Sequence, residues 1–192
     1  MEYDPEKRII TLDRELSRLD KLVLRFISIV QKHVKYVIIL GYISILLGRS
    51  RATEDVDVFI QPLSYDAFVN LYDDLKSHGF WCINAEAPED VYSCLKEFEA
   101  ARFAEDGMTI PNFEVKFPKR TIDEETFTDA PIDVIVPGGI IKVSSLERQV
   151  AFKKYFLKSE KDLEDARHIE EIFKGKLDQV KINKLKDAIE RI

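Results

Sequence analysis

The chain has 192 residues, of which 45% are hydrophobic and 33% charged, with only seven Gly and seven Pro. This composition is typical of one ordinary folded domain and excludes disordered, collagen-like and low-complexity proteins. The formal net charge of −6 excludes a globally basic nucleic-acid-binding protein. Residues 138–192 nevertheless hold 13 Lys and Arg against 10 Asp and Glu, so this part is the better candidate for contacting a polyanion.

Neither membrane insertion nor export is expected. The longest apolar stretch, residues 36–47, contains Gly41 and is shorter than the roughly 20 residues that a membrane span needs. The acidic N-terminus lacks the apolar core of a signal peptide. Cys82 and Cys94 form no CxxC motif, and the histidines are too scattered for a zinc cluster. We therefore predict a cytoplasmic protein without a membrane partner.

The N-terminal part carries an apolar stripe at helical spacing. Leucine, valine and phenylalanine residues recur every three or four positions from Leu12 to Val34, which predicts a long amphipathic helix. We expect this stripe to pack onto its own domain, although it could also serve a homodimer or a cognate partner protein.

The rest of the chain divides into a mixed core and a helical tail. Alternating and apolar runs predict strands over 36–40, 55–60, 80–83, 113–117, 132–136 and 140–143, and helices over 41–47, 65–77, 88–98 and 121–124. Capping boxes at Ser144 and Ser159 predict helices thereafter. We expect an α/β (α+β) domain with an N-terminal helix over 1–34, a core over 35–143 and a C-terminal helical segment over 144–192.

Two aspartates on the strand DVDVFI carry most of the chemical information. Asp55 and Asp57 are two residues apart, so both carboxylates face the same side of the strand, at its polar end. Adjacent carboxylates repel each other, and a divalent cation such as Mg²⁺ would offset that repulsion. Such pairs serve in metal-assisted phosphoryl transfer. The alternative is a solvated strand end without function.

The segment 38–60, IILGYISILLGRSRATEDVDVFI, resembles the DNA polymerase β nucleotidyltransferase superfamily. In that superfamily an apolar strand ending in Gly-Gly or Gly-Ser and a short helix precede Asp-x-Asp on the next strand. The segment is more narrowly similar to the minimal AbiEii-like, type IV toxin-type group, whose block reads roughly GGYALxLHGxxRxTxDID. The matching positions are Gly41, Tyr42, Gly48, Arg51, Thr53, Asp55 and Asp57. Leu40 departs from the pattern, because a glycine is usual there.

The resemblance implies a nucleotidyltransferase fold, with a mixed twisted sheet flanked by helices, and an NTP substrate. It further implies two Mg²⁺ ions, or Mn²⁺ in their place, held by Asp55, Asp57 and a third carboxylate on a neighbouring strand. We assign that third role to Glu114 in FEVKF, with Asp133 in IDVIV as the competitor. Lys116 shares the face of Glu114 and is a candidate triphosphate ligand.

Further nucleotide contacts are expected from Gly41, Arg51, Thr53, Lys153 and Asp162. An arginine in the loop before the aspartates can bind a phosphate in bidentate fashion, or it can pair with Glu54 or Asp55. Lys153 lies on an apolar helical stripe, which is unusual for a lysine unless it has a partner or a ligand. Asp162 is equally the last residue of the Ser159 capping box.

The acceptor is not encoded in the metal site. The toxin-type resemblance implies RNA, such as a tRNA 3′ end, or a protein side chain, and a place in a toxin–antitoxin pair. Leu40 and Glu114 leave open a catalytically weak interaction module, antitoxin-like or a scaffold. A small-molecule (antibiotic) adenylyltransferase is a further alternative.

Overall fold

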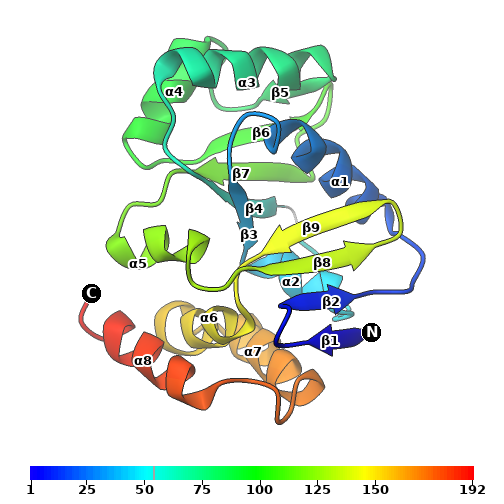
Figure 1. Ribbon diagram of the computed structural model, residues 1–192. Coiled ribbons are helices and arrows are strands. Elements are labelled where there is room, and N and C mark those ends of the chain that lie inside the picture. Colours follow the sequence, from blue (N-terminus) through cyan, green and yellow to red (C-terminus); the bar gives the residue numbers. More distant parts are fainter. Residues whose placement is uncertain (54) are drawn as a thin grey trace.

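A computed structural model of the chain describes residues 1–53 and 55–192. Within this part the strands form one mixed sheet of nine strands in the order β1-β2-β8-β9-β3-β4-β7-β6-β5, with helices packed on it (Figure 1). The strands are β1 Glu2–Asp4, β2 Ile9–Thr11, β3 Tyr36–Ile39, β4 Asp55–Ile60, β5 Phe80–Cys82, β6 Ala101–Glu105, β7 Asn112–Lys116, β8 Ile132–Val136 and β9 Gly139–Val143.

The helices are interspersed among the strands up to β9 and then follow one another. They are α1 Arg18–Val30, α2 Gly41–Leu46, α3 Tyr65–Ser77, α4 Pro88–Lys96, α5 Thr121–Glu124, α6 Leu146–Ala151, α7 Glu160–Ile172 and α8 Gln179–Ile189. A short 3₁₀ helix, η1 (Glu125–Phe127), extends α5, and a π-helix, η2 (Phe152–Leu157), extends α6. The predicted α/β class with a C-terminal helical segment is confirmed, and the domain boundaries at residues 34 and 143 stay a prediction.

The N-terminal helix is shorter than the apolar spacing predicts. Ser17 caps α1, because its side chain accepts from the backbone of Asp20 while the Asp20 carboxylate accepts from the Ser17 backbone at 2.8 Å. Residues 2–11 instead form β1 and β2, and β2 pairs in parallel with β8. Strands of three residues are too short to show an alternation, so the sequence pattern did not reveal them.

The apolar stripe of α1 is buried within its own domain. Phe26 is fully buried, and its ring stacks on that of Phe113 in β7 with centroids 3.8 Å apart. Tyr42 in α2 donates to the buried Asp20 carboxylate at 2.7 Å, which ties α2 to the first turn of α1. This packing agrees with the expectation that α1 serves its own core.

The alternation along β4 and β7 separates a core face from a polar face. Val56, Val58 and Phe113 are buried on the side that α1 covers. Asp55, Asp57 and Glu114 occupy the alternate positions and so face the other side. The sheet therefore presents its carboxylates on one face, and the buried apolar side chains at the alternate positions lie on the other face, which α1 covers.

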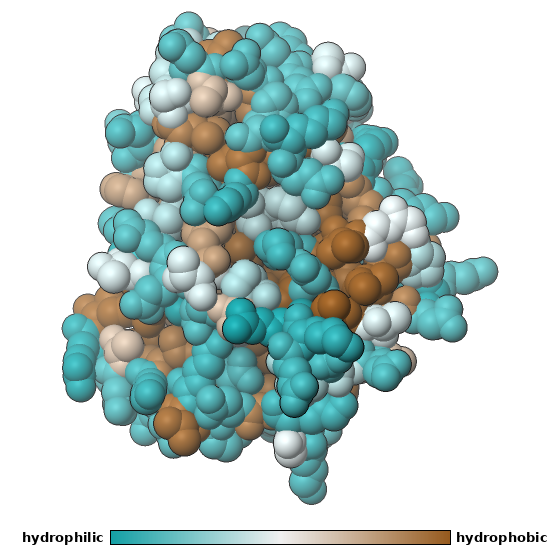
Figure 2. All heavy atoms as spheres, viewed as in Figure 1, coloured by the Kyte–Doolittle hydropathy of each residue, from teal (hydrophilic) through white to brown (hydrophobic). Residues whose placement is uncertain are grey.

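Apolar side chains are also exposed on the β8–β9 hairpin. Ile135 and Ile140 are cross-strand partners that are 37% and 53% exposed, and Figure 2 shows apolar surface over this hairpin. No helix in the described part of the chain combines the length and hydropathy of a membrane-spanning segment.

Candidate active site

The sheet brings three of the predicted acids together on β4 and β7. These strands are parallel neighbours, and Asp57 is in register with Glu114, while Asp55 is opposite Asn112. Asp133 lies on β8, which β9 and β3 separate from β4. Its side chain is 40% exposed and pairs with Lys142. The geometry thus favours Glu114 over Asp133 as the third acid, although its role as a metal ligand stays a prediction.

Lys116 lies between two of these carboxylates. Its Nζ is 2.9 Å from Asp57 Oδ1 and 2.7 Å from Glu114 Oε2, and Arg102 contacts the other oxygen of Glu114 at 2.9 Å. Lys116 is therefore bound to carboxylates here rather than free to meet a phosphate. Its ammonium group is shared between the two acids, and Asp57 has no cation besides it among the described residues, whereas Glu114 also has Arg102.

The pKa values reflect this incomplete neutralisation. Burial raises the pKa of Asp57 above its usual range, and nearby Asp55 and Glu114 add to the effect, although Lys116 opposes it. Burial also acts to raise the pKa of Glu114, but Lys116 and Arg102 outweigh it and lower that pKa. For Lys116, burial acts to lower the pKa, but Asp57 and Glu114 outweigh it and raise the value. Burial thus disfavours the charged form of Asp57 even though Lys116 lies beside it.

The donor set fits a divalent cation. Three carboxylates face two cations, Lys116 and Arg102, which leaves negative charge uncompensated, and carboxylate oxygens are the ligands that Mg²⁺ prefers. Among the described residues, however, no three His, Cys, Asp or Glu side chains already converge on a point that could hold a metal ion. The Glu114 carboxylate is instead engaged by Lys116 and Arg102.

The turn between β3 and α2 has a backbone conformation that favours glycine, although Leu40 occupies it. Leu40 has φ 60° and ψ −128°, a conformation that costs a residue with a side chain roughly 1–3 kcal/mol. Next to it, a Cβ atom on Gly41 would lie 3.2 Å from Nη2 of Arg51, so the absent side chain lets the guanidinium close on the start of α2. The substitution at Leu40 therefore leaves the backbone turn in place.

This strain gives a specific expectation for Leu40. Leu40→Gly and Leu40→Ala both remove the side chain, but only glycine adopts the observed φ and ψ freely. We expect the Gly variant to have a free energy of unfolding about 1 kcal/mol higher than that of the Ala variant. Urea denaturation of both proteins checks this. An Ala variant that is the more stable of the two would contradict the strained turn.

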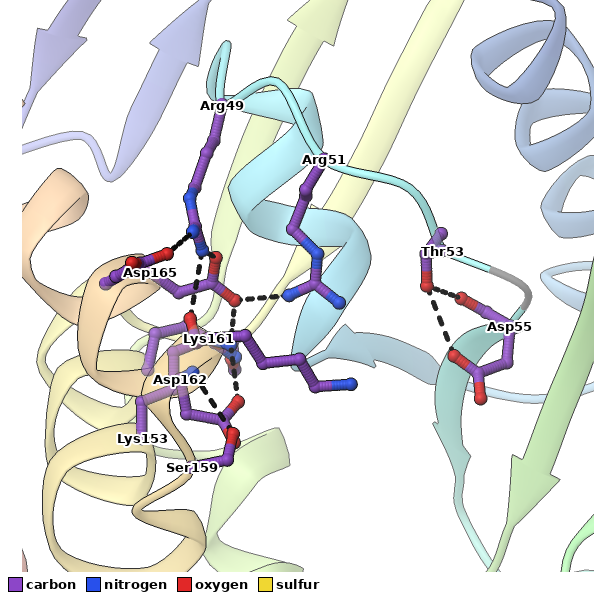
Figure 3. Close-up of polar contacts among 12 residues, drawn as sticks. Arg49, Arg51, Thr53, Asp55, Lys153, Ser159, Lys161, Asp162 and Asp165 are labelled. Carbon is purple, nitrogen blue, oxygen red and sulfur yellow. Dashed lines mark hydrogen bonds and ion pairs between the residues drawn. The ribbon is translucent and has the colours of Figure 1, made fainter.

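A buried ionic cluster holds the loop before the aspartates against α7 (Figure 3). Asp165 is fully buried and accepts from Lys153 at 2.7 Å and from Arg51 at 2.5 Å, and it also pairs with Arg49. Arg49 further contacts Glu164. Burial acts to raise the pKa of Asp165, but Lys153 and the two arginines outweigh it and hold that pKa below its usual value. The cluster fixes Arg51 beside Gly41.

Arg51 and Thr53 therefore have protein partners. Arg51 pairs with Asp165 rather than with Asp55, and the alternative pairing with Glu54 lies outside the described residues. The Thr53 hydroxyl is 2.9 Å from the backbone oxygen of Asp55 and 3.2 Å from its Oδ1, so it orients that carboxylate. Their predicted contacts with nucleotide stay predictions.

Lys153 and Asp162 meet in the same cluster. Lys153 is fully buried, and its Nζ is 3.5 Å from Asp162 Oδ1. The backbone amide of Asp162 donates to Ser159 Oγ at 3.3 Å, so Asp162 also belongs to the helix cap. Both residues thus have structural roles in the absence of nucleotide. Asp165 and Arg49 are not among the site residues predicted from the sequence. The three-residue spacing from Asp162 to Asp165 nevertheless places both acids on one side of α7.

The arrangement of elements is similar to that of known nucleotidyltransferases. The crystal structure of ANT(2'')-Ia in complex with adenylyl-2''-tobramycin aligns with a TM-score of 0.58 and 11% identity, covering 91% of this chain and 98% of that one. The solution structure of the antibiotic-resistance factor ANT(2'')-Ia gives a TM-score of 0.56 and 14% identity, covering 89% and 90%. A nucleotidyltransferase-like protein from Paracoccidioides brasiliensis gives 0.54 and 15%, covering 89% and 86%.

No protein-family model matches the sequence, and no curated protein matches it either. The structural likeness extends over most of each chain at low identity, so it concerns the fold. The chain has the nucleotidyltransferase fold. The narrower resemblance to the AbiEii-like group stays a prediction from the residues around Asp55.

Proposed function

We propose that this chain is a metal-dependent nucleotidyltransferase that moves a nucleoside monophosphate from an NTP to an acceptor. The observation that carries the proposal is the set of carboxylates on one face of β4 and β7, with Asp57 in register with Glu114 and Asp55 two residues away. A structural role would not explain three acids gathered where burial already raises the pKa of Asp57.

The residues have distinct parts in the proposed reaction. Asp55, Asp57 and Glu114 would hold Mg²⁺, or Mn²⁺, which polarises the α-phosphate and stabilises the pyrophosphate leaving group when bound. The strained turn at Leu40 and the start of α2 at Gly41 would receive phosphate oxygens, and Arg51, already held against Gly41, would bind them as well. Lys116 would leave its carboxylate partner and bind a phosphate instead. Lys153 would act indirectly, because it binds Asp165, which in turn holds Arg51.

The acceptor proposed first is RNA, such as a tRNA 3′ end, with a protein side chain as the other toxin-type acceptor. The C-terminal segment supports RNA because residues 138–192 carry more basic than acidic side chains. In this proposal the protein is a cytoplasmic component of a toxin–antitoxin pair with a cognate partner. A homodimer or a catalytically weak interaction module is the alternative.

A second candidate, a small-molecule adenylyltransferase, is favoured by the fold comparison. ANT(2'')-Ia, which shares the fold over most of both chains, forms a complex with adenylyl-2''-tobramycin. Acceptor identity depends on residues outside the carboxylate set, so this likeness does not decide between the two acceptor classes.

One assay separates these functions. The purified protein is incubated with Mg²⁺ and each α-labelled NTP, in turn with total tRNA, with no added acceptor and with an aminoglycoside mixture including tobramycin. Label on tRNA, on the protein itself or on the aminoglycoside identifies the acceptor, and EDTA should abolish each signal. A folded protein that labels none of these would favour the interaction module.

A further inference from the structure

A cavity lies beside the carboxylates on the same face of the sheet. Phe59 follows Asp57 by two residues on β4, Lys116 follows Glu114 by two on β7, and the side chains of Phe59 and Lys116 line the cavity. Residues two apart on a strand are about 7 Å apart. A group bound in the cavity would therefore lie about one ribose away from the candidate metal ligands.

The cavity wall formed by α6 and the end of β9 is polar and incompletely satisfied. Gln149 is 2% exposed, and its Nε2 donates to Ser144 Oγ at 2.5 Å, but its Oε1 has no hydrogen-bond partner among the described residues. Arg148 is 3% exposed, and its Nη2 also lacks a hydrogen bond there, with an ion-pair contact to Glu125 at 3.6 Å. Buried polar groups in proteins rarely lack a hydrogen-bond partner. Within the described part of the chain, this wall thus holds one acceptor and one donor that make no hydrogen bond.

The other walls suit a flat ring. Phe152 and Phe156 on η2 line the cavity together with Leu40, and the Arg120 guanidinium lies 4.6 Å from the centroid of Phe156. Aromatic rings and guanidinium planes are the surfaces on which nucleobases stack. The cavity volume is 140 Å³. A cavity of about 150 Å³ in another protein holds one benzene ring, so the available space suits a single six-membered ring better than a fused pair.

We propose that this cavity is the nucleobase subsite and that it prefers the single ring of a pyrimidine, so that CTP or UTP is the favoured donor. The inference rests on the proposed function and adds the substrate class. Cytosine offers an amino donor and uracil an N–H donor for Gln149 Oε1, and each has a carbonyl acceptor for Arg148. Neither contact requires either side chain to give up a hydrogen bond that it already makes.

Calorimetric titration of the full chain with Mg²⁺ and non-hydrolysable CTP, UTP, ATP and GTP analogues tests the subsite, and tripolyphosphate reports on the phosphate site alone. We expect CTP or UTP to bind at least about tenfold more tightly than ATP and GTP, a difference of about 1.4 kcal/mol. Gln149→Leu and Phe156→Ala should each remove most of this preference and leave tripolyphosphate affinity unchanged.

Phe156→Ala carries the test if Gln149→Leu fails to fold, because Phe156 is 41% exposed. Phe98→Ala is the matched control, since Phe98 is 45% exposed and lies under Lys119, outside the cavity. Equal or tighter binding of purine analogues, or a Phe156→Ala protein with the wild-type preference, would overturn the subsite and leave the proposed function standing. A protein that binds neither nucleotides nor tripolyphosphate would overturn both.

Discussion

Replacing Asp57 with asparagine should abolish nucleotidyl transfer while leaving the chain at least as stable as the wild type. The substitution removes a charge that Asp55 and Glu114 disfavour, and Lys116 keeps Glu114 as its partner. Burial already raises the pKa of Asp57, so the charged form opposes folding. If the carboxylate holds the metal, we expect transfer to fall by at least about 10³-fold.

Asp133→Asn is the matched control for this experiment. Asp133 is also a strand aspartate that pairs with a lysine, but it lies on β8, away from β4 and β7. Asp133→Asn should therefore keep the wild-type transfer rate, whereas Asp57→Asn should lose it, and the melting temperature of each variant shows that it is folded. If Asp133→Asn removed activity and Asp57→Asn did not, the third acid and the site would have to be reassigned to the β8 side of the sheet.

Asp165→Ala should destabilise the chain strongly, by about 3–5 kcal/mol. Among the described residues, the substitution leaves the fully buried Lys153 with the longer contact to Asp162 alone as an ion pair. It also releases Arg51 from α7, whereas Arg49 loses one contact to this helix and keeps Glu164. Asp187→Ala, on an exposed position of α8, is the control and should change stability by less than about 0.5 kcal/mol. Urea unfolding at pH 7 measures both.

The coupling within the cluster gives a second readout. Lys153→Met alone should also destabilise the chain, and the Lys153→Met, Asp165→Ala double variant should lose less stability than the two single changes predict together. The pKa of Asp165 is lowered in the folded chain, so its contribution is present above the usual carboxyl pKa and is lost as the pH falls through the lowered value. The difference between wild type and Asp165→Ala should therefore shrink below about pH 4. An additive, pH-independent difference would mean that the cluster does not stabilise the fold.

The carboxylate face could be predicted from the sequence because its geometry is local. A period of two places Asp55 and Asp57 on one side of β4, and the same period places Glu114 and Lys116 together on β7. That β4 and β7 are neighbours was predicted from the family resemblance rather than from any pattern in the residues. Without that pairing, the sequence does not distinguish Glu114 from Asp133 as the third carboxylate.

The ionic cluster and three of the strands could not be predicted in this way. Arg49 and Arg51 meet Asp165 across more than 110 residues of sequence, and no local spacing marks such a pair. The strands β1, β2 and β6 either are too short for an alternation or, in β6, carry buried residues at adjacent positions. A glycine is usual in place of Leu40, and the sequence does not show that this leucine adopts φ 60° and ψ −128°.

The most direct test of the central claim compares an NTP labelled on its α-phosphate with the same NTP labelled on its γ-phosphate, using the acceptor that the labelling assay with tRNA and aminoglycosides identifies. Attack on the α-phosphate at Asp55, Asp57 and Glu114 predicts that α-label appears on the acceptor in the presence of Mg²⁺ and that γ-label leaves as pyrophosphate. Transfer of γ-label to the acceptor, or retention of α-label transfer in the Asp57→Asn protein, would contradict the assignment of this site.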